Sequence, residues 1–304
     1  MTNCSRVPGF ILQGFSGIPE LQTISVAFFL FVYIFSFFGN ISIITAVTLD
    51  SHLHTPMYFF LKHLSLIDLC STSTTLPRAL FAAMAGSEFI SLPECAAQLY
   101  VFVFCAATEC FLITSMAYDR CLAIYHPLTY GSTMTQQFCC ALVGVAWASG
   151  LLFSSFHTVN TFTLSFCDPL LEHFFCDLPP LFRLSCTDPH KHEAIGFAVS
   201  GCVIMSCFAL TVLSYIQIVA TVLRIQSTQG RQKAFSTCSS HLITVILFYG
   251  TGSSTYMRAA NGYSPFQGRL AAIFYSILTP TLNPIIYSMR NKDMKAALRK
   301  LYLR

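Results

Sequence analysis

One apolar stretch near the start of the chain strongly constrains what it can fold into. From Ile24 to Leu49 there is no Asp, Glu, Lys or Arg. About 20 consecutive apolar residues form a helix long enough to cross the hydrocarbon core of a bilayer. Similar apolar blocks recur along the sequence, and only 10% of the residues are charged, whereas a soluble domain has about 25%. We therefore expect an integral membrane protein.

The apolar blocks predict seven transmembrane helices, at 23–49, 57–84, 94–126, 138–160, 192–226, 231–257 and 268–289. The whole chain, 1–304, is then one all-α membrane domain whose helix bundle occupies 23–289. The helices follow one another closely, except across a long connection from roughly Asn160 to Lys191. In the tail, 290–304, four apolar residues recur on one helical face: Met294, Ala297, Leu298 and Leu301. This pattern predicts a short amphipathic eighth helix on the membrane surface.

The basic residues predict how the chain is oriented, because Lys and Arg are enriched in cytoplasmic loops. With the C-terminus in the cytoplasm, eleven of the 17 basic residues fall inside: Lys62, Arg120, Arg224, Arg231, Lys233, Arg290, Lys292, Lys295, Arg299, Lys300 and Arg304. An odd number of spans then makes the N-terminus, 1–22, extracellular. The sequon that begins at Asn3 lies on this side, where glycosylation occurs. No cleavable signal peptide is visible, so the first span is expected to direct membrane insertion.

Four cysteines are expected on the extracellular side. Cys95 begins the third helix, and Cys167, Cys176 and Cys186 lie in the long connection. An oxidising compartment favours two disulfides, for which three pairings are open. His173, Cys176 and Asp177 also resemble a metal-ligand cluster, since His and Cys are soft ligands.

Two carboxyl groups fall within predicted spans, where ionisable side chains usually mark function. Asp68 lies midway along the second helix and Glu109 midway along the third. At similar depth they are expected to share a cation such as sodium, or a proton. The alternative is that each is a neutral, hydrogen-bonded packing residue. No other cofactor is expected.

Two further polar features lie near the cytoplasmic end. Asp119 and Arg120 are adjacent in the third helix, and Arg120 is expected to exchange Asp119 for another partner. In the seventh helix Pro284 follows Asn283 and removes a backbone hydrogen bond, which predicts a hinge there.

Together these residues resemble the pattern of the rhodopsin-like G-protein-coupled receptors. The positions of this sequence that match the family pattern are Gly39-Asn40, Asp68, Asp119-Arg120, Trp147 and the run from Asn283 to Tyr287. The resemblance narrows to odorant receptors through four segments, at 53–61 (LHTPMYFFL), 116–120 (MAYDR), 233–242 (KAFSTCSSHL) and 284–291 (PIIYSMRN). The segments at 54–56 (HTP) and 248–251 (FYGT) resemble the tetrapod-type, class II branch. Cys121 and Tyr125 depart from the family pattern, in which tyrosine and cysteine are usual, and they place the strength of coupling in question.

The resemblance implies disulfides between Cys95 and Cys176 and between Cys167 and Cys186, which ranks the disulfide above the metal cluster. It also implies an odorant pocket in the outer half of the bundle, between helices three, five, six and seven. The residues expected to line that pocket are Phe102, Val103, Ala106, Ala107, Val199, Ser200, Val203, Tyr249, Ser253, Tyr256, Ile273 and Ser276. None of them is charged, which favours small neutral volatile molecules.

For signalling, the resemblance implies a heterotrimeric G protein of the stimulatory, olfactory class and a rise in cyclic AMP. The residues expected to take part are Asp119, Arg120, Tyr215, Asn283, Pro284 and Tyr287. We expect no enzymatic activity and no nucleic-acid partner. The alternatives are a rhodopsin-like receptor for another small ligand outside the nose, or a transporter or channel. The second alternative lacks support, because no internal repeat with interrupted helices is visible.

Overall fold

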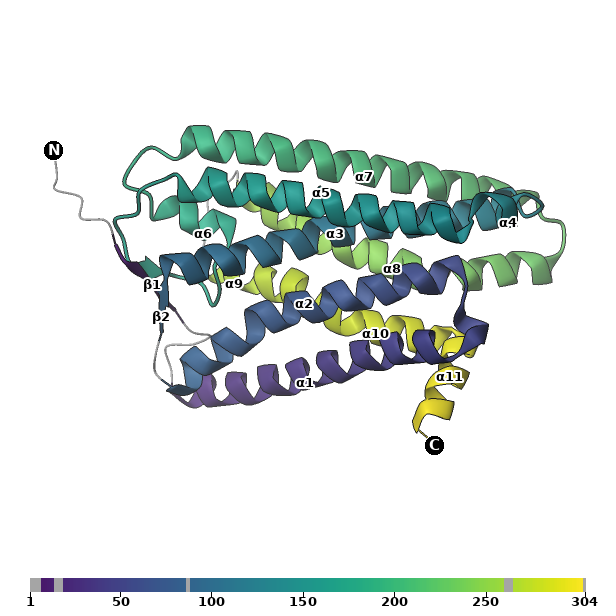
Figure 1. The fold of residues 1–304 in the computed structure, drawn as a ribbon, viewed down its shortest axis with the longest axis horizontal. Helices are drawn as coiled ribbons and strands as arrows, with labels where there is room; N and C mark the ends of the chain where they lie inside the picture. The colour runs from purple at the N-terminus through teal and green to yellow at the C-terminus, as the bar shows by residue number, and fades with distance from the viewer. Residues whose placement is uncertain (1–6, 14–18, 86–87, 260–264, 303–304) are drawn as a thin grey trace.

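The fold was analysed in a computed structural model, which describes residues 7–13, 19–85, 88–259 and 265–302. Within these ranges, side chains are not described at 19–21, 85, 233, 237, 253–259, 265–266 and 289–290. Long helices lie side by side along the longest axis of the molecule (Figure 1). A small β-sheet is at one end of the bundle, here called the sheet end, and the last helix of the chain is at the other (Figure 1).

Each predicted span corresponds to a helical segment. The first six are α1 (Pro19–Leu49), α2 (Pro56–Ala85), α3 (Leu92–Tyr125), α5 (Gln136–Phe162), α7 (His190–Arg224) and α8 (Thr228–Ala259). The last is divided into α9 (Pro265–Ile273), a π-helical turn η2 (Phe274–Leu278) and α10 (Thr279–Arg290). The irregular turn thus precedes Pro284, which lies inside α10. The amphipathic stretch forms α11 (Lys292–Tyr302), with Met294 and Ala297 buried.

Several short elements were not expected from the sequence. They are the 3₁₀-helix η1 (Ser51–Leu53), the helices α4 (Tyr130–Thr133) and α6 (Leu178–Arg183), and the strands β1 (Gly9–Leu12), β2 (Phe89–Ser91) and β3 (Leu170–Leu171). The expected all-α class is therefore correct for the bundle, but the chain also has a three-stranded sheet.

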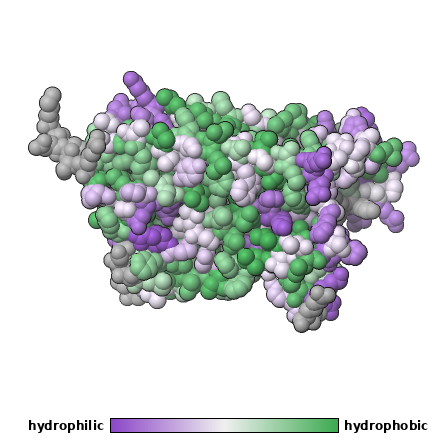
Figure 2. Space-filling model, viewed as in Figure 1, coloured by the Kyte–Doolittle hydropathy of each residue, from purple (hydrophilic) through white to green (hydrophobic). Residues whose placement is uncertain are grey.

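The apolar surface of the bundle agrees with a membrane location. Within the described residues, five segments are long and apolar enough to cross a bilayer: Gln22–Leu49, Leu92–Tyr125, Gln136–Phe162, His190–Arg224 and Gln267–Ser288. Large apolar side chains such as Phe31, Leu152 and Leu223 are exposed on these helices. Figure 2 shows hydrophobic residues over much of the middle of one face, and hydrophilic residues towards the end that carries the C-terminus.

Helix α3 is the centre of the bundle, since it packs against α2, α5, α7 and α8. A glycine in α5 allows one of these contacts to be close. A Cβ atom at Gly150 would collide with the Thr108 hydroxyl and lie 3.1 Å from the Phe104 carbonyl oxygen. Nearby, Ser154 donates a hydrogen bond to the Tyr100 carbonyl oxygen, so polar as well as apolar groups join α3 to α5.

The sheet joins segments that are far apart in the chain. The order is β2-β1-β3, with β1 antiparallel to β2 and parallel to β3. Gly9 of β1 is paired with Ser91 of β2, and a Cβ atom at Gly9 would lie 2.6 Å from a Phe89 ring carbon. The next residue, Phe10, is fully buried and packs edge-to-face against Phe166 with ring centroids 5.2 Å apart.

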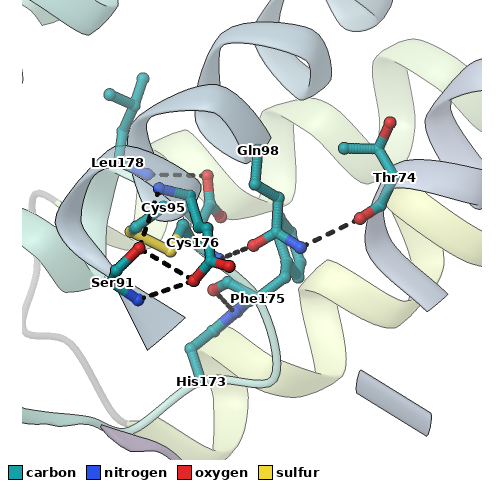
Figure 3. Close-up of a disulfide and its surroundings, with 10 residues drawn as sticks. Thr74, Ser91, Cys95, Gln98, His173, Phe175, Cys176 and Leu178 are labelled. Carbon is teal, nitrogen blue, oxygen red and sulfur yellow. Dashed lines mark hydrogen bonds between the residues drawn. A yellow bond between two sulfur atoms is a disulfide. The ribbon is translucent and has the colours of Figure 1, made fainter. Parts of the chain in front are cut away.

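The long connection is tied to the sheet end of α3 by the disulfide between Cys95 and Cys176, and a second disulfide joins Cys167 to Cys186. Both expected pairings are therefore present. Gln98, one turn after Cys95, accepts a hydrogen bond from the Cys176 amide at 2.9 Å (Figure 3). Its side-chain amide donates to the Thr74 carbonyl oxygen of α2 at 3.0 Å, so this residue joins two helices to the connection (Figure 3).

We predict that Cys95→Ser and Cys176→Ser each destabilise the protein by about 2–5 kcal/mol, since either removes the same native disulfide. Surface delivery of an epitope-tagged receptor should fall equally in both variants. The double variant should be no worse than either single one. Cys70→Ser is the matched control, because Cys70 is a free, exposed cysteine of α2. Additive losses in the double variant would contradict a shared bond.

Candidate functional site

The long connection covers the sheet end of the bundle and packs onto helical side chains that were expected to line a pocket. Phe174 and Phe175 are buried, and the Phe175 ring lies 4.9 Å from that of Phe102 on α3. Tyr275, in the π-helical turn, lies 5.9 Å from Phe102 between ring centroids and donates a hydrogen bond to the Asp177 carboxylate. The connection, α3 and the η2 turn therefore meet around Phe102.

Below this contact, the structure brings most of the expected pocket residues onto neighbouring helices. Phe102, Val103, Ala106 and Ala107 lie on α3, which packs against α7 and α8. The expected residues Val199, Ser200 and Val203 are on α7, and Tyr249 is on α8. Ser253 and Tyr256 also belong to α8, but their side chains lie outside the described residues.

Three of the expected residues have contacts that the sequence did not suggest. Ser200 is buried, and its hydroxyl lies 3.0 Å from Nε2 of His157 on α5. Ser276 is buried and donates to the Ala272 carbonyl oxygen in its own helix at 2.6 Å. Ile273 lines a cavity of about 300 Å³ between α9 and α1.

A pair of thiols lies one helical turn deeper than the expected pocket residues and was missed from the sequence. Cys110 of α3 and Cys207 of α7 are both buried and lie close enough for their thiols to interact. The Cys110 sulfur also lies 3.5 Å from the Tyr249 hydroxyl. A sequence signal was available, because Cys110 follows Ala106 by four residues and Cys207 follows Val203 by four, so each shares a helical face with a predicted pocket residue.

The two intramembrane carboxyl groups occupy the middle of the bundle. Asp68 and Glu109 are almost fully buried and close enough to interact electrostatically. The Asn283 side-chain amide donates to Asp68 Oδ2 at 2.8 Å and lies near Glu109. Among the described residues, Asp68 Oδ1 and Glu109 Oε1 have no hydrogen-bond partner. The geometry thus leaves two buried acidic oxygens available to a proton or a cation.

At the opposite end of α3 the expected signalling residues lie among polar contacts. Arg120 donates from Nε to Asp119 Oδ2 at 2.9 Å, and Tyr130 donates to Asp119 Oδ1 at 2.7 Å. The Tyr215 hydroxyl lies 2.8 Å from Nδ1 of His241 on α8. His241 also contacts α3, since its Nε2 atom lies 3.0 Å from the Ile113 carbonyl oxygen.

The atypical residues near this end have different surroundings. Cys121 is buried and donates a hydrogen bond to the Gln217 side-chain oxygen of α7 at 3.0 Å. Tyr125 is exposed and packs against His126 at 4.3 Å between ring centroids. Cys121 therefore joins α3 to α7, whereas Tyr125 lies on the surface.

Comparison with known proteins identifies the family of the chain. The olfactory receptor family model matches residues 29–304. This chain belongs to the olfactory receptor family. It is 44% identical to human olfactory receptor 9G4 over 98% of this chain and 91% of that protein. Mouse olfactory receptor 8U3 is 43% identical, over 98% of this chain and 94% of its own length.

A solved structure supports the architecture separately. Squid rhodopsin superposes with a TM-score of 0.72 over 98% of this chain and 91% of that one, at 16% identity. The fold is therefore rhodopsin-like and helical. This olfactory receptor is an odorant-sensing, G-protein-coupled receptor and a multi-pass protein of the plasma membrane, and it is not an enzyme.

The olfactory receptor has a buried histidine in the connection at its sheet end, outside the spans. Burial lowers the pKa of His173, and the Arg269 charge lowers it further, against the opposing effects of Asp177 and the Phe175 carbonyl. Nδ1 of His173 lies 2.9 Å from the Phe175 carbonyl oxygen (Figure 3). Within the described ranges, no group of three or more His, Cys, Asp or Glu side chains is arranged to hold a metal ion.

We predict that acidification destabilises this olfactory receptor through His173. Its pKa is lower in the folded state than the usual value of about 6.5, so below that pH the unfolded chain binds the extra proton more readily. The thermal midpoint should decrease as the pH is lowered from about 7.5 to about 5.5, and it should decrease less in His173→Gln. His190→Gln, at an exposed histidine of α7, is the control. An equal acid sensitivity in His173→Gln and the original receptor would exclude His173 as the cause.

Proposed function

We propose that the receptor crosses the membrane seven times, with its N-terminus and sheet end outside, Asn3 glycosylated, and α11 as an eighth helix along the cytoplasmic surface. The amphipathic character of α11 supports this placement. Met294 and Ala297 are buried, and α11 contacts α1 and α10. The exposed side of the helix is basic, and Lys300 pairs with Asp50 at 3.3 Å. Basic residues at this end agree with a cytoplasmic position.

In this orientation, we place the odorant between α3, α7, α8 and the η2 turn, beneath the long connection. The residues that we assign to its lining are those expected from the sequence except Ile273, which lines the cavity between α9 and α1, and all are uncharged. Tyr249 supplies a hydroxyl group on the α8 side, where its ring packs against Phe208 at 5.1 Å between centroids. A mostly apolar lining with few polar groups is typical of small-molecule sites. It favours neutral odorants that carry one hydrogen-bonding group.

The observation that carries this proposal is the position of α3. The helix runs from Phe102, beneath the connection, to the Asp119-Arg120 pair at the other end of the bundle, and it contacts α7 and α8 along the way. An agonist that contacts the active arrangement better than the inactive one shifts the equilibrium by that difference in free energy. A shift of α8 relative to α3 would then change the surroundings of Arg120.

The contacts near Arg120 supply the elements of such a switch. Arg120 is held by Asp119, which is also held by Tyr130. His241 on α8 bonds both Tyr215 of α7 and the α3 backbone. Outward motion of α8 would break the bond between His241 and Ile113 and open a space for a G protein beside Arg120. We assign the partner to the stimulatory, olfactory class, which raises cyclic AMP, because of the family resemblance.

We also propose that sodium binds between Asp68 and Glu109 in the inactive state. Two buried carboxylates at close range repel each other, and a bridging cation or a proton relieves the repulsion. Asp68 Oδ1 and Glu109 Oε1, which lack hydrogen-bond partners among the described residues, are suitable oxygen ligands for a hard cation. Asn283 of α10 donates to Asp68 and lies near Glu109, so residues of α2, α3 and α10 meet at the site.

We predict that Arg120→Ala abolishes odorant-evoked cyclic AMP without preventing surface delivery. The substitution removes the cation at the proposed G-protein site and leaves the odorant pocket unchanged. Cells expressing each receptor should first be screened against a broad odorant panel, with an empty-vector control. Arg224→Ala is the matched control, since Arg224 is an exposed arginine at the same end of the bundle. A full response from Arg120→Ala at equal surface expression would remove Arg120 from the mechanism.

We predict that sodium raises the thermal midpoint of the ligand-free receptor more than potassium does at the same ionic strength. Glu109→Gln should weaken this difference, because it removes one of the two negative charges. It should also change basal signalling. Glu172→Gln, at an exposed acid of the long connection, should respond as the original receptor does. An identical response of Glu109→Gln and the original receptor to the ion exchange would favour the alternative of two neutral packing residues.

A further inference from the structure

A cavity that is open on one side lies at the sheet end, between α1 and α9, and none of the residues assigned to the odorant pocket lines it. Its volume is about 300 Å³, at the lower limit of small-molecule pockets. Most of the wall is apolar and includes Ile24 and Phe28 of α1, Ile273 of α9, and Phe174 of the long connection. The polar lining consists of Ser25 and Arg269. The cavity thus combines an apolar wall with one cation, whereas the proposed lining of the odorant pocket is uncharged.

Arg269 is held in place by neutral acceptors. Its Nη1 atom donates to the Gln13 side-chain oxygen at 3.0 Å and to the Glu172 carbonyl oxygen at 3.5 Å. Across the described part of the chain, no carboxylate forms an ion pair with it. A guanidinium carries five N–H donors in a planar fork. Arg269 therefore keeps its full charge and several donors for an anion, while two hydrogen bonds fix its position.

The order of these residues along the helices places Phe28 and Ile273 farther from the sheet end than Arg269. Both α1 and α9 begin at the sheet end. Arg269 and Ser25 lie about one helical turn nearer that end than Ile273 and Phe28, and Ile24 lies beside Ser25 in the chain. Arginine near a helix end is favourable at the level of lipid headgroups. In the proposed orientation the cation and Ile24 thus lie towards the membrane surface, and the part of the wall formed by Phe28 and Ile273 extends towards the membrane interior.

We propose that this cavity binds a medium-chain fatty carboxylate, with the carboxylate on the Arg269 guanidinium and the alkyl chain between α1 and α9. Arginine pairs with a carboxylate through two parallel hydrogen bonds, which are stronger than bonds between neutral groups. A single alkyl chain matches the small volume, whereas a phospholipid has two longer chains. A neutral amphiphile of equal length gains only the apolar contact and leaves the Arg269 donors without an anion.

The test is direct binding of labelled decanoate to the purified full-length receptor in nanodiscs of zwitterionic lipid. Unlabelled decanoate should displace the label, and decan-1-ol at the same concentration should not. Arg269→Gln should weaken binding by about 10-fold or more, the typical effect of losing a charged hydrogen bond. The affinity of Arg269→Lys for decanoate should lie between those of the original receptor and Arg269→Gln, because lysine keeps the charge but lacks the planar fork of N–H donors. Lys191→Gln, at an exposed cation near the same end, is the control and should bind normally.

A second variant separates a specific site from general partitioning. Ser25→Trp fills the cavity while Arg269 remains, so it should abolish decanoate binding, and its odorant-evoked cyclic AMP should be unchanged. That readout also distinguishes this site from the odorant pocket. The proposal is overturned if Arg269→Gln or Ser25→Trp binds decanoate as the original receptor does. It is also overturned if decan-1-ol competes equally well, since the label would then be partitioning into an apolar crevice.

Discussion

Lipid offers no hydrogen-bonding partner, and this constraint decides how the rest of the molecule is built. Each backbone amide within the bilayer must be satisfied inside its own segment, so every span is a helix. Polar side chains must also find partners within the bundle. Asn283 with Asp68, His157 with Ser200, and His241 with Tyr215 all meet this requirement between neighbouring helices. Buried polar atoms that lack a partner among the described residues, such as Asp68 Oδ1, are consequently informative about function.

Helix α3 connects these polar contacts along the length of the receptor. It carries Cys95 and Gln98 at the sheet end, Glu109 in the middle and the Asp119-Arg120 pair at the other end. Because it packs against α2, α5, α7 and α8, a change in any of those contacts reaches a residue with a proposed role. The family's function, conversion of odorant binding into G-protein activation, requires such a link between two distant sites.

The sheet end is cross-linked by several contacts, since a sheet, two disulfides and the Gln98 hydrogen bonds all join there. The proposed odorant pocket lies beneath this structure and the proposed fatty-acid cavity beside it. They differ in chemistry because one lining is uncharged, whereas the other contains Arg269. With both proposed sites, the receptor would distinguish a neutral volatile ligand from a charged amphiphile by site as well as by affinity.

The sequence alone determined the order of the helical segments, the amphipathic α11 and, through its family motifs, the two disulfides, because apolar runs, helical periodicity and family motifs are local signals. It also placed Asp68 and Glu109 midway along their helices and Arg120 near the end of α3. Only the tertiary structure decided which side chains meet. Some of these contacts depend on helix rotation and on contacts between distant segments. They are the pairing of β1 with β2 and β3, the approach of Cys110 to Cys207, and the position of Ile273 facing α1. Those contacts are set by packing across the whole bundle, and no short stretch of sequence encodes them.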